Sequence, residues 1–146
     1  MRAIALLSLF ALSGCASVAL LVSHYMIGMR SQLSEARDMT VRFDGKVVCG
    51  ARVSKGAVAD CGPISYLPSI ATVSWKISPF EWAATDRQRH SAVVRVNGHV
   101  PPWFTNGDAI VFTITKSHGL SVAFDCERLS RACVGVPQVQ LPVQMQ

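Results

Sequence analysis

From Thr40 onward, hydrophobic and polar residues alternate in short runs separated by turn residues. The clearest runs lie at 73–77, 92–96, 110–114 and 120–124. A period of two residues is typical of strands that bury one face. The runs are separated by DGK at 44–46, SKG at 54–56, NG at 97–98, NGD at 106–108 and KSHG at 116–119. Seven or eight strands over residues 40–136 predict a single β-sandwich domain of immunoglobulin-like type.

The SKG turn predicts a hairpin loop of three residues with Gly56 in the left-handed conformation. A hairpin centred on Lys55 would place Cys49 opposite Cys61. Directly opposed strand residues have Cβ atoms about 4.5–5.5 Å apart, which is close to what a disulfide needs. A Cys49–Cys61 disulfide across a hairpin is therefore expected. The Asn97-Gly98 pair predicts a second hairpin with a type I′ turn.

The cysteine count bears on export. Five cysteines are an odd number for an exported domain that pairs its thiols, but a lipid on Cys15 would leave four. Cys126 and Cys133 would lie about 10 Å apart on a continuous helix, but they can meet across a turn. A second disulfide between them is expected, although three connectivities are formally open. The uncharged tail at 137–146 is predicted to be extended, with an added edge strand as the alternative.

Residues 1–14 have the features of a secretion signal. Arg2 supplies a positive start, and Ala3–Ala11 form an apolar core. Leu12-Ser13-Gly14-Cys15 resembles the lipobox of bacterial lipoproteins, in which small residues precede the cysteine that takes the lipid. Cleavage would make Cys15 the acylated N-terminus. The resemblance implies sorting to the outer membrane, facing the periplasm, because Ala16 rather than Asp follows Cys15.

The apolar character does not stop at Cys15, because residues 16–29 also remain apolar. Residues 3–23 alone are long enough to cross a hydrocarbon core of about 30 Å as a helix. An uncleaved helix that spans the inner membrane once is therefore the alternative. Its positive flank would place the four remaining cysteines in the reducing cytoplasm, which favours the lipoprotein. Residues 15–39 are predicted to form a tether or short helix, apolar first and charged later.

The chain has 14 basic and 9 acidic residues, with a formal net charge of +5, and the basic residues are scattered along it. The densest basic segment is 87–90, which directly follows Asp86. A nucleic-acid-binding protein should show a concentrated basic face with stacking aromatic residues. No nucleic-acid partner is expected.

Known catalytic signatures are missing from the sequence: it contains no G-x-S-x-G, H-E-x-x-H, P-loop or dinucleotide-binding motif. His90, His99 and His118 are dispersed, and they would have to converge to hold a metal. The cysteines lack paired C-x-x-C spacing, which favours disulfides over zinc. We expect neither an enzyme, nor a metal site, nor a cofactor.

Two predicted loops carry aromatic and arginine side chains. The simpler interpretation is that the aromatic residues cap the ends of the sandwich core. Alternatively, residues 79–90 and 101–108 bind a partner, because Trp and Arg are enriched at binding hot spots. The candidate partner-binding residues are Phe80, Trp82, Arg87, Arg89, Trp103 and Phe104.

Between residues 58 and 125, several short elements occur in a fixed order. They are Cys61 before Leu67-Pro68, the V-x-W strand at 73–75, the V-x-V strand at 94–96, Pro102-Trp103, and two apolar strands around a glycine turn. This order resembles a family of small bacterial lipoproteins encoded beside type VI secretion effectors, some of which are immunity proteins. The chain departs from that pattern at Gly62, directly after Cys61.

The resemblance implies a lipid-anchored protein that binds another protein and neutralises a toxin attacking the envelope or its lipids. It implies no catalytic residue. The alternative is a structural or assembly subunit of a bacterial envelope complex, anchored by the uncleaved helix.

Overall fold

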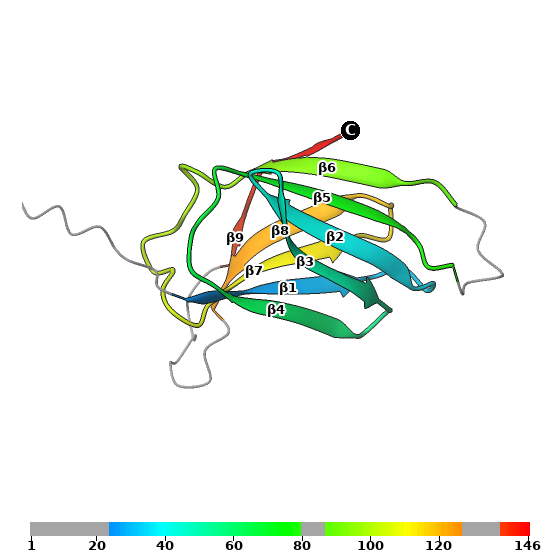
Figure 1. The fold of residues 1–146 in the computed structure, drawn as a ribbon, viewed down its shortest axis with the longest axis horizontal. Helices are drawn as coiled ribbons and strands as arrows, with labels where there is room; N and C mark the ends of the chain where they lie inside the picture. The colour runs from blue at the N-terminus through cyan, green and yellow to red at the C-terminus, as the bar shows by residue number, and fades with distance from the viewer. Residues whose placement is uncertain (1–23, 80–86, 127–137) are drawn as a thin grey trace, which may run out of the picture.

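The computed structural model describes residues 24–79, 87–126 and 138–146, which form strands and turns (Figure 1). These residues contain no helix, and therefore none that could span a bilayer. The strands are β1 (Tyr25–Ser31), β2 (Arg37–Phe43), β3 (Lys46–Val53), β4 (Val58–Ile64), β5 (Ile70–Ile77), β6 (His90–Arg95), β7 (Ala109–Ile114), β8 (Leu120–Asp125), β9 (Val139–Gln140) and β10 (Val143–Met145).

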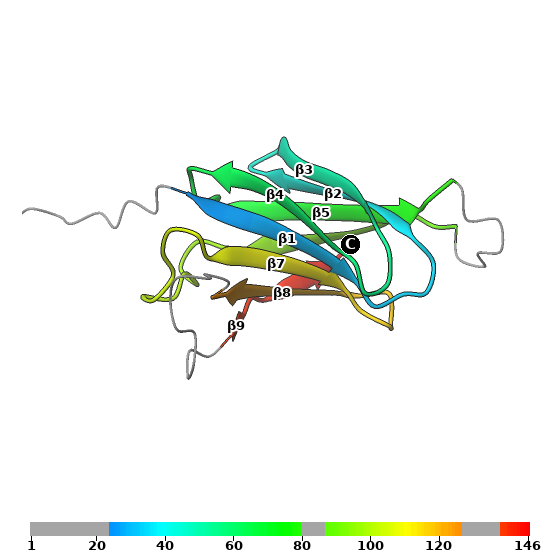
Figure 2. The same cartoon turned by 90° about the horizontal axis from the view of Figure 1, so that it is seen from below.

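The strands form two five-stranded sheets that face each other (Figure 2). The first sheet has the order β4-β1-β7-β8-β9, and the second has the order β10-β6-β5-β2-β3. Every pair is antiparallel except β1 and β7, which run parallel. The predicted β-sandwich is confirmed. An immunoglobulin constant domain places its first strand beside its second, in a different order, so the immunoglobulin-like type is not confirmed.

Alternating side chains fill the space between the sheets, as the period of two predicts. Met39, Val41 and Phe43 of β2 are buried, while the residues between them are partly exposed. Trp75 of β5 is 1% exposed and lies in the same core. Burying a large apolar side chain contributes about 1.5–3 kcal/mol, so this layer dominates the stability of the domain.

The predicted tether or short helix at 15–39 is wrong for the described residues 24–39. Residues 25–31 are strand β1, residues 37–43 are strand β2, and the domain therefore begins before Thr40. Tyr25, Ile27 and Met29 point into the core and are 0% exposed, and Gly28 is buried on the opposite face. Because the outward residues Met26 and Gly28 are apolar as well as the inward ones, this part of β1 continues the apolar run of the preceding segment without a break.

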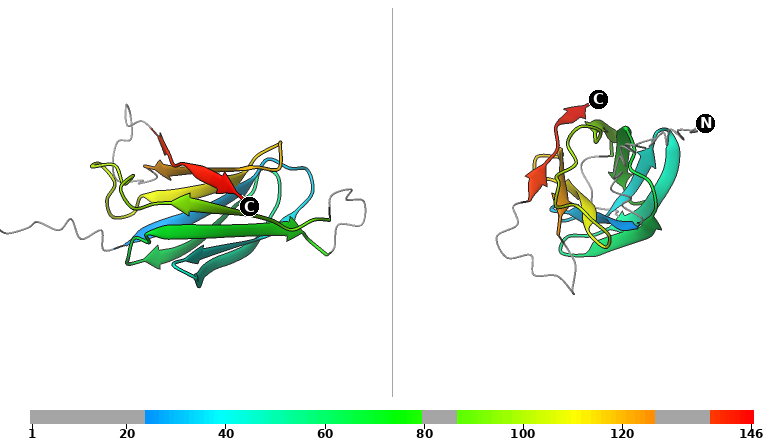
Figure 3. Two further views of the ribbon diagram at one scale, coloured as in Figure 1. Left: turned by 90° about the horizontal axis from the view of Figure 1, so that it is seen from above. Right: turned by 90° about the vertical axis from the view of Figure 1, so that its left-hand side faces the viewer.

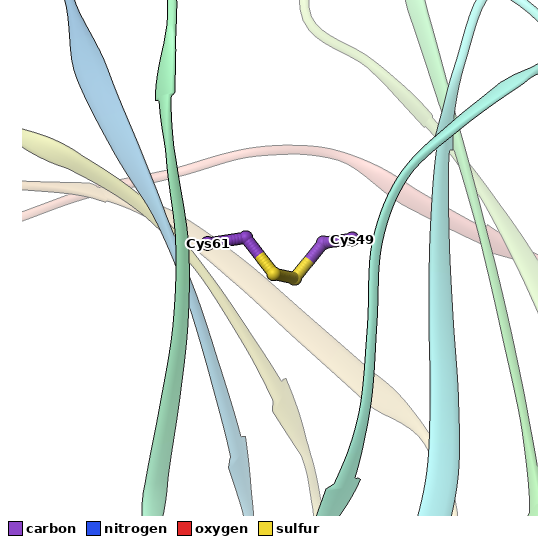
Figure 4. Close-up of a disulfide and its surroundings, with 2 residues drawn as sticks. All are labelled: Cys49 and Cys61. Atoms are coloured by element: carbon purple, nitrogen blue, oxygen red, sulfur yellow. A yellow bond between two sulfur atoms is a disulfide. The ribbon is translucent and has the colours of Figure 1, made fainter.

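The Cys49–Cys61 disulfide is confirmed, with Cα atoms 5.7 Å apart, but the hairpin predicted around it is wrong (Figure 4). Gly56 has a φ of +76°, as the SKG turn predicts. However, β3 pairs with β2 and β4 pairs with β1, so this turn crosses from one sheet to the other. The disulfide therefore joins the edge strands of two sheets. Cys126 is also disulfide-bonded, and Cys133 lies outside the described residues.

The other predicted turns are present, but a second one, like the SKG turn, does not form a hairpin. Asp44 and Gly45 both have positive φ values and connect β2 to β3, as the DGK turn predicts. At Asn97-Gly98 the His99 amide donates to the Val96 carbonyl at 3.1 Å, which closes a turn. The type I′ hairpin predicted there is wrong, because the next strand, β7, belongs to the opposite sheet.

The C-terminal tail forms edge strands on both sheets (Figure 3). β9 pairs with β8 and β10 pairs with β6, and Leu141 between them is 6% exposed. The alternative of an added edge strand is therefore the correct one. The tail covers one open side of the sandwich, while the Cys49–Cys61 disulfide closes the opposite side.

The sandwich has two ends, each formed by a different set of loops (Figure 1). The N-terminal end comprises His24, the start of β1, and the loops 65–69 and 97–108. The distal end comprises residues 31–37, the turns at 54–57 and 115–119, and residues 78 and 87–90.

Replacing both Cys49 and Cys61 by Ala should lower the free energy of unfolding by about 3 kcal/mol. The two residues are separated by 12 positions, and opening a loop of this size gives the unfolded chain more conformational freedom. Equilibrium urea unfolding, followed by tryptophan fluorescence, measures the change against the oxidised protein. An unchanged midpoint would show that the clamp between the sheets adds no stability.

Candidate partner-binding groove on the first sheet

An open groove of about 860 Å³ crosses the outer face of the first sheet toward its distal end. It is lined by the end of β1, the 55–58 segment, and parts of β7, β8 and β9. The turn at 54–57 borders the groove because Ser31 at the end of β1 forms a β-bridge with Lys55. Strands that are far apart in the sequence thus build one surface.

The floor of the groove is low because its central strands carry short side chains on this face. Val111 and Ala123 of the floor lie in register on β7 and β8. They point away from the core, yet Val111 and Ala123 are only 3% and 4% exposed. Gly28 lies beside Val111 on β1, and a Cβ added there would meet the Val111 Cγ2 atom at 3.4 Å, an ordinary van der Waals distance.

Three cations line the groove: Arg30 on β1, Lys55 in the turn and Lys116 after β7. Lys55 and Lys116 are exposed, and among the described residues that line the groove there is no Asp or Glu. The backbone N–H of Lys116 donates to the Gln32 Oε1 atom at 3.3 Å, which ties the turn after β7 to the end of β1. The groove is therefore electropositive and suited to a negatively charged ligand surface.

The opposite wall is a row of hydrogen-bonded polar side chains. The Ser121 hydroxyl donates to the Gln140 Oε1 atom at 2.9 Å, and the Gln140 amide donates to the Gln138 Oε1 atom at 3.3 Å. These bonds hold the glutamines against β8. A wall of amides and hydroxyls offers both donors and acceptors to a polar partner.

A second group of polar side chains closes the distal end between the sheets. Arg37 is 2% exposed, and its Nη2 atom lies 3.9 Å from the Glu35 Oε2 atom. The rings of Trp75, His90 and His118 stack in series, with centroid separations of 5.6 and 5.9 Å. Because Arg37 and Trp75 are buried, this group supports the distal end rather than offering a surface for a ligand.

The structure does not bring the predicted partner-binding residues together. Arg87 and Arg89 are exposed at the distal end, and Phe80 and Trp82 lie outside the described residues. Trp103 and Phe104 belong to the loop 97–108, which lies at the opposite, N-terminal end (Figure 1). Phe104 is 2% exposed and packs edge-on against Tyr25 and Phe124, so it caps the core, as the simpler interpretation predicts.

The histidines do not gather into one site. His90 and His118 stack at the distal end, whereas His99 lies in the turn at the other end, where its Nδ1 atom is 3.2 Å from the Asn97 carbonyl oxygen. Within the described parts of the chain, no group of three or more His, Cys, Asp or Glu residues is arranged to hold a metal ion.

Arg30, Lys55, Lys116 and the glutamines belong to no sequence motif that marks a binding site. A partial signal exists, because outward positions of β7 and β8 are occupied by Val111, Thr113, Ser121 and Ala123, which are all short. Yet the groove depends on β1 lying beside β7, and that parallel pairing has no local sequence signature.

No protein-family model, curated protein or solved structure matches the chain.

Replacing Glu35 by Gln should lower the melting temperature at neutral pH and have progressively less effect in acid. The pKa of Glu35 lies below its usual value of 4.5 because its own backbone N–H and the Ser34 side chain hydrogen-bond the carboxylate, with added attraction from Arg37 and His118. A lowered pKa stabilises the fold above the unfolded-state value, and that contribution disappears as the pH falls through the folded-state value. Thermal melts of both proteins between pH 3 and pH 7 measure the difference. A difference that grew in acid would contradict this assignment.

Proposed function

We propose that the protein is an envelope lipoprotein that binds a protein partner through the groove on its first sheet. In this proposal residues 1–14 are the signal, Cys15 carries the lipid, and the domain stands on the periplasmic face of the outer membrane. The partner is a toxin that attacks the envelope or its lipids, so the protein acts as an immunity protein. It is not an enzyme, and it needs no cofactor.

The observation that carries the proposal is the separation of charge along the sandwich. The described basic residues at the distal end are Arg30, Arg37, Arg52, Lys55, Lys76, Arg87, Arg89 and Lys116, against the acids Glu35 and Asp38. The N-terminal end instead has the acids Asp44, Asp108 and Asp125 against the bases Arg42, Lys46 and Arg95, so its described residues carry no basic excess. An anchor at the N-terminus would turn the basic end and its groove away from the membrane.

This arrangement favours a protein partner with an acidic surface. Complementary charge steers two proteins into contact and selects against partners of like charge. Arg30 stands on a paired strand, the bridge to Ser31 holds the Lys55 backbone, and Gln32 holds the Lys116 N–H, so the cations have defined backbone positions before binding. A rigid surface loses little conformational freedom when a complex forms, which favours tight binding.

Two double variants test the role of the groove. Lys55→Glu with Lys116→Glu reverses two exposed cations at the groove, and Lys46→Glu with Arg95→Glu makes the same change in charge elsewhere on the sandwich. In cells that produce the toxin encoded beside the gene, the groove variant should fail to protect, while the control variant should protect like the natural protein. With purified toxin, the affinity should fall at least about 10-fold for the groove variant, and less at high salt.

Equal protection by both variants would exclude the groove as the binding surface. If the natural protein neither protects nor forms a complex with the toxin, the immunity function is wrong. A stable assembly of high mass, extracted from membranes in the absence of any toxin, would instead support a subunit of an envelope complex.

The lipid anchor has its own test. Labelling with a fatty-acid analogue, followed by intact-mass measurement of the membrane fraction, should find a triacylated chain that begins at Cys15. The label should be lost in Cys15→Ala, because the thiol is the acceptor of the lipid. An unprocessed and unlabelled chain in the membrane would support the alternative of an uncleaved helix at residues 3–23 in the inner membrane.

A further inference from the structure

We infer that the N-terminal end of the sandwich rests on the bilayer, with the rings of Tyr66 and Trp103 in the headgroup region. The ligand of this surface is a zwitterionic lipid interface. The inference rests on the anchoring of residues 1–23 in the proposed function, but not on the toxin or the groove.

The point where the described chain begins is fixed to two loops of this end. The His24 carbonyl accepts a hydrogen bond from the Gly107 amide at 2.8 Å, and the His24 amide donates to the Asn106 Oδ1 atom at 3.2 Å. The Tyr25 hydroxyl donates to the Tyr66 carbonyl at 2.7 Å. The loops 65–69 and 97–108 therefore surround the position from which the anchor segment leaves the domain (Figure 1).

Both alternatives for the anchor place a membrane close to this end. With a lipid on Cys15, the chain up to His24 reaches at most about 30 Å even when fully extended. With a helix that spans the bilayer at residues 3–23, His24 would follow the last membrane residue directly. In either case the loops around His24 are the part of the domain nearest the lipid.

The side chains of these loops suit a lipid interface. Tyr66 is 43% exposed, Trp103 is half-buried, and Pro102 is exposed. Tyrosine and tryptophan concentrate at membrane surfaces because each ring joins an apolar body to a polar group. The loops 65–69 and 97–108 contain no Lys or Arg. They therefore offer no cation to anionic headgroups, and the contact we infer is made by the aromatic rings.

The core holds Trp103 in place. Its ring packs edge-on against Phe104 at 6.3 Å between centroids, and Phe104 packs in turn on Tyr25 at 5.5 Å and Phe124 at 4.8 Å. Tyr25 is the first residue of strand β1, so Trp103 is connected through Phe104 to the start of the domain. The partner-binding hypothesis for Trp103 is thereby replaced by a lipid-binding role.

The test uses the full-length chain reconstituted in phosphatidylcholine vesicles whose acyl chains are brominated near the headgroup. Bromine quenches only tryptophan that lies within the bilayer. The chain has three tryptophans, so the total tryptophan emission should fall by no more than the part that Trp103 contributes. The decrease should be the same at low and at high salt. Trp103→Phe should abolish the quenching, whereas Trp75→Phe should keep it, because Trp75 is buried in the core. If Trp103→Phe lowers the melting temperature, Trp103→Tyr takes its place, because it removes the tryptophan emission and keeps an aromatic ring with a polar group.

Flotation of the same vesicles separates the two ways of failing. If the chain floats with the vesicles but its emission is not quenched through Trp103, this inference is overturned and the anchor is unaffected. A chain that does not float overturns the anchor in the proposed function and this inference with it. Quenching that disappears at high salt would show electrostatic adsorption, and it would also overturn the role of the aromatic rings.

Discussion

The structure depends on the burial of strand β1 in the middle of the first sheet. β1 pairs antiparallel with β4 and parallel with β7, so both of its edges are hydrogen-bonded. Its inward side chains Tyr25, Ile27 and Met29 are completely buried in the core. Its outward residue Arg30 lines the groove and contributes a positive charge, and Gly28 lies beside Val111 of the floor. Losing this one strand would therefore remove core, groove and N-terminal attachment together.

The position of β1 also orients the molecule. β1 starts at the N-terminal end and finishes at the cationic margin of the groove, so the start of the domain and Ser31 beside Lys55 lie at opposite ends of one strand. Tyr25, at its start, holds the aromatic residues of the N-terminal end, and Ser31, at its finish, brings Lys55 to the groove. One end is thus aromatic, with its described bases matched by acids, and the other has an excess of bases. This polarity relates the proposed lipid contact and the proposed partner contact through a single element.

The sequence predicts local features better than the arrangement of strands. The alternating runs, the turns at Gly45 and Gly56, and the Cys49–Cys61 pair are all present, because each depends on residues close together or on a strong covalent constraint. Strand β1 was missed because an apolar strand continues directly from an apolar signal. The two hairpins were wrong because turn residues fix the bend of the chain but not the sheet that the next strand joins. The groove could not be predicted, since it requires the parallel pairing of β1 with β7.

The closure of the sandwich explains why the groove lies on a face rather than at an edge. On one side the Cys49–Cys61 disulfide joins the edge strands β3 and β4. On the other side the C-terminal segment pairs with β8 and then with β6, and Leu141 fills the space between them. Exposed strand edges are sites of unwanted pairing with other chains, and closure suppresses them. With both sides closed, the surface left for binding in our proposal is an open face of a sheet. On that face short residues form the floor of the groove, and cations and glutamines form its walls.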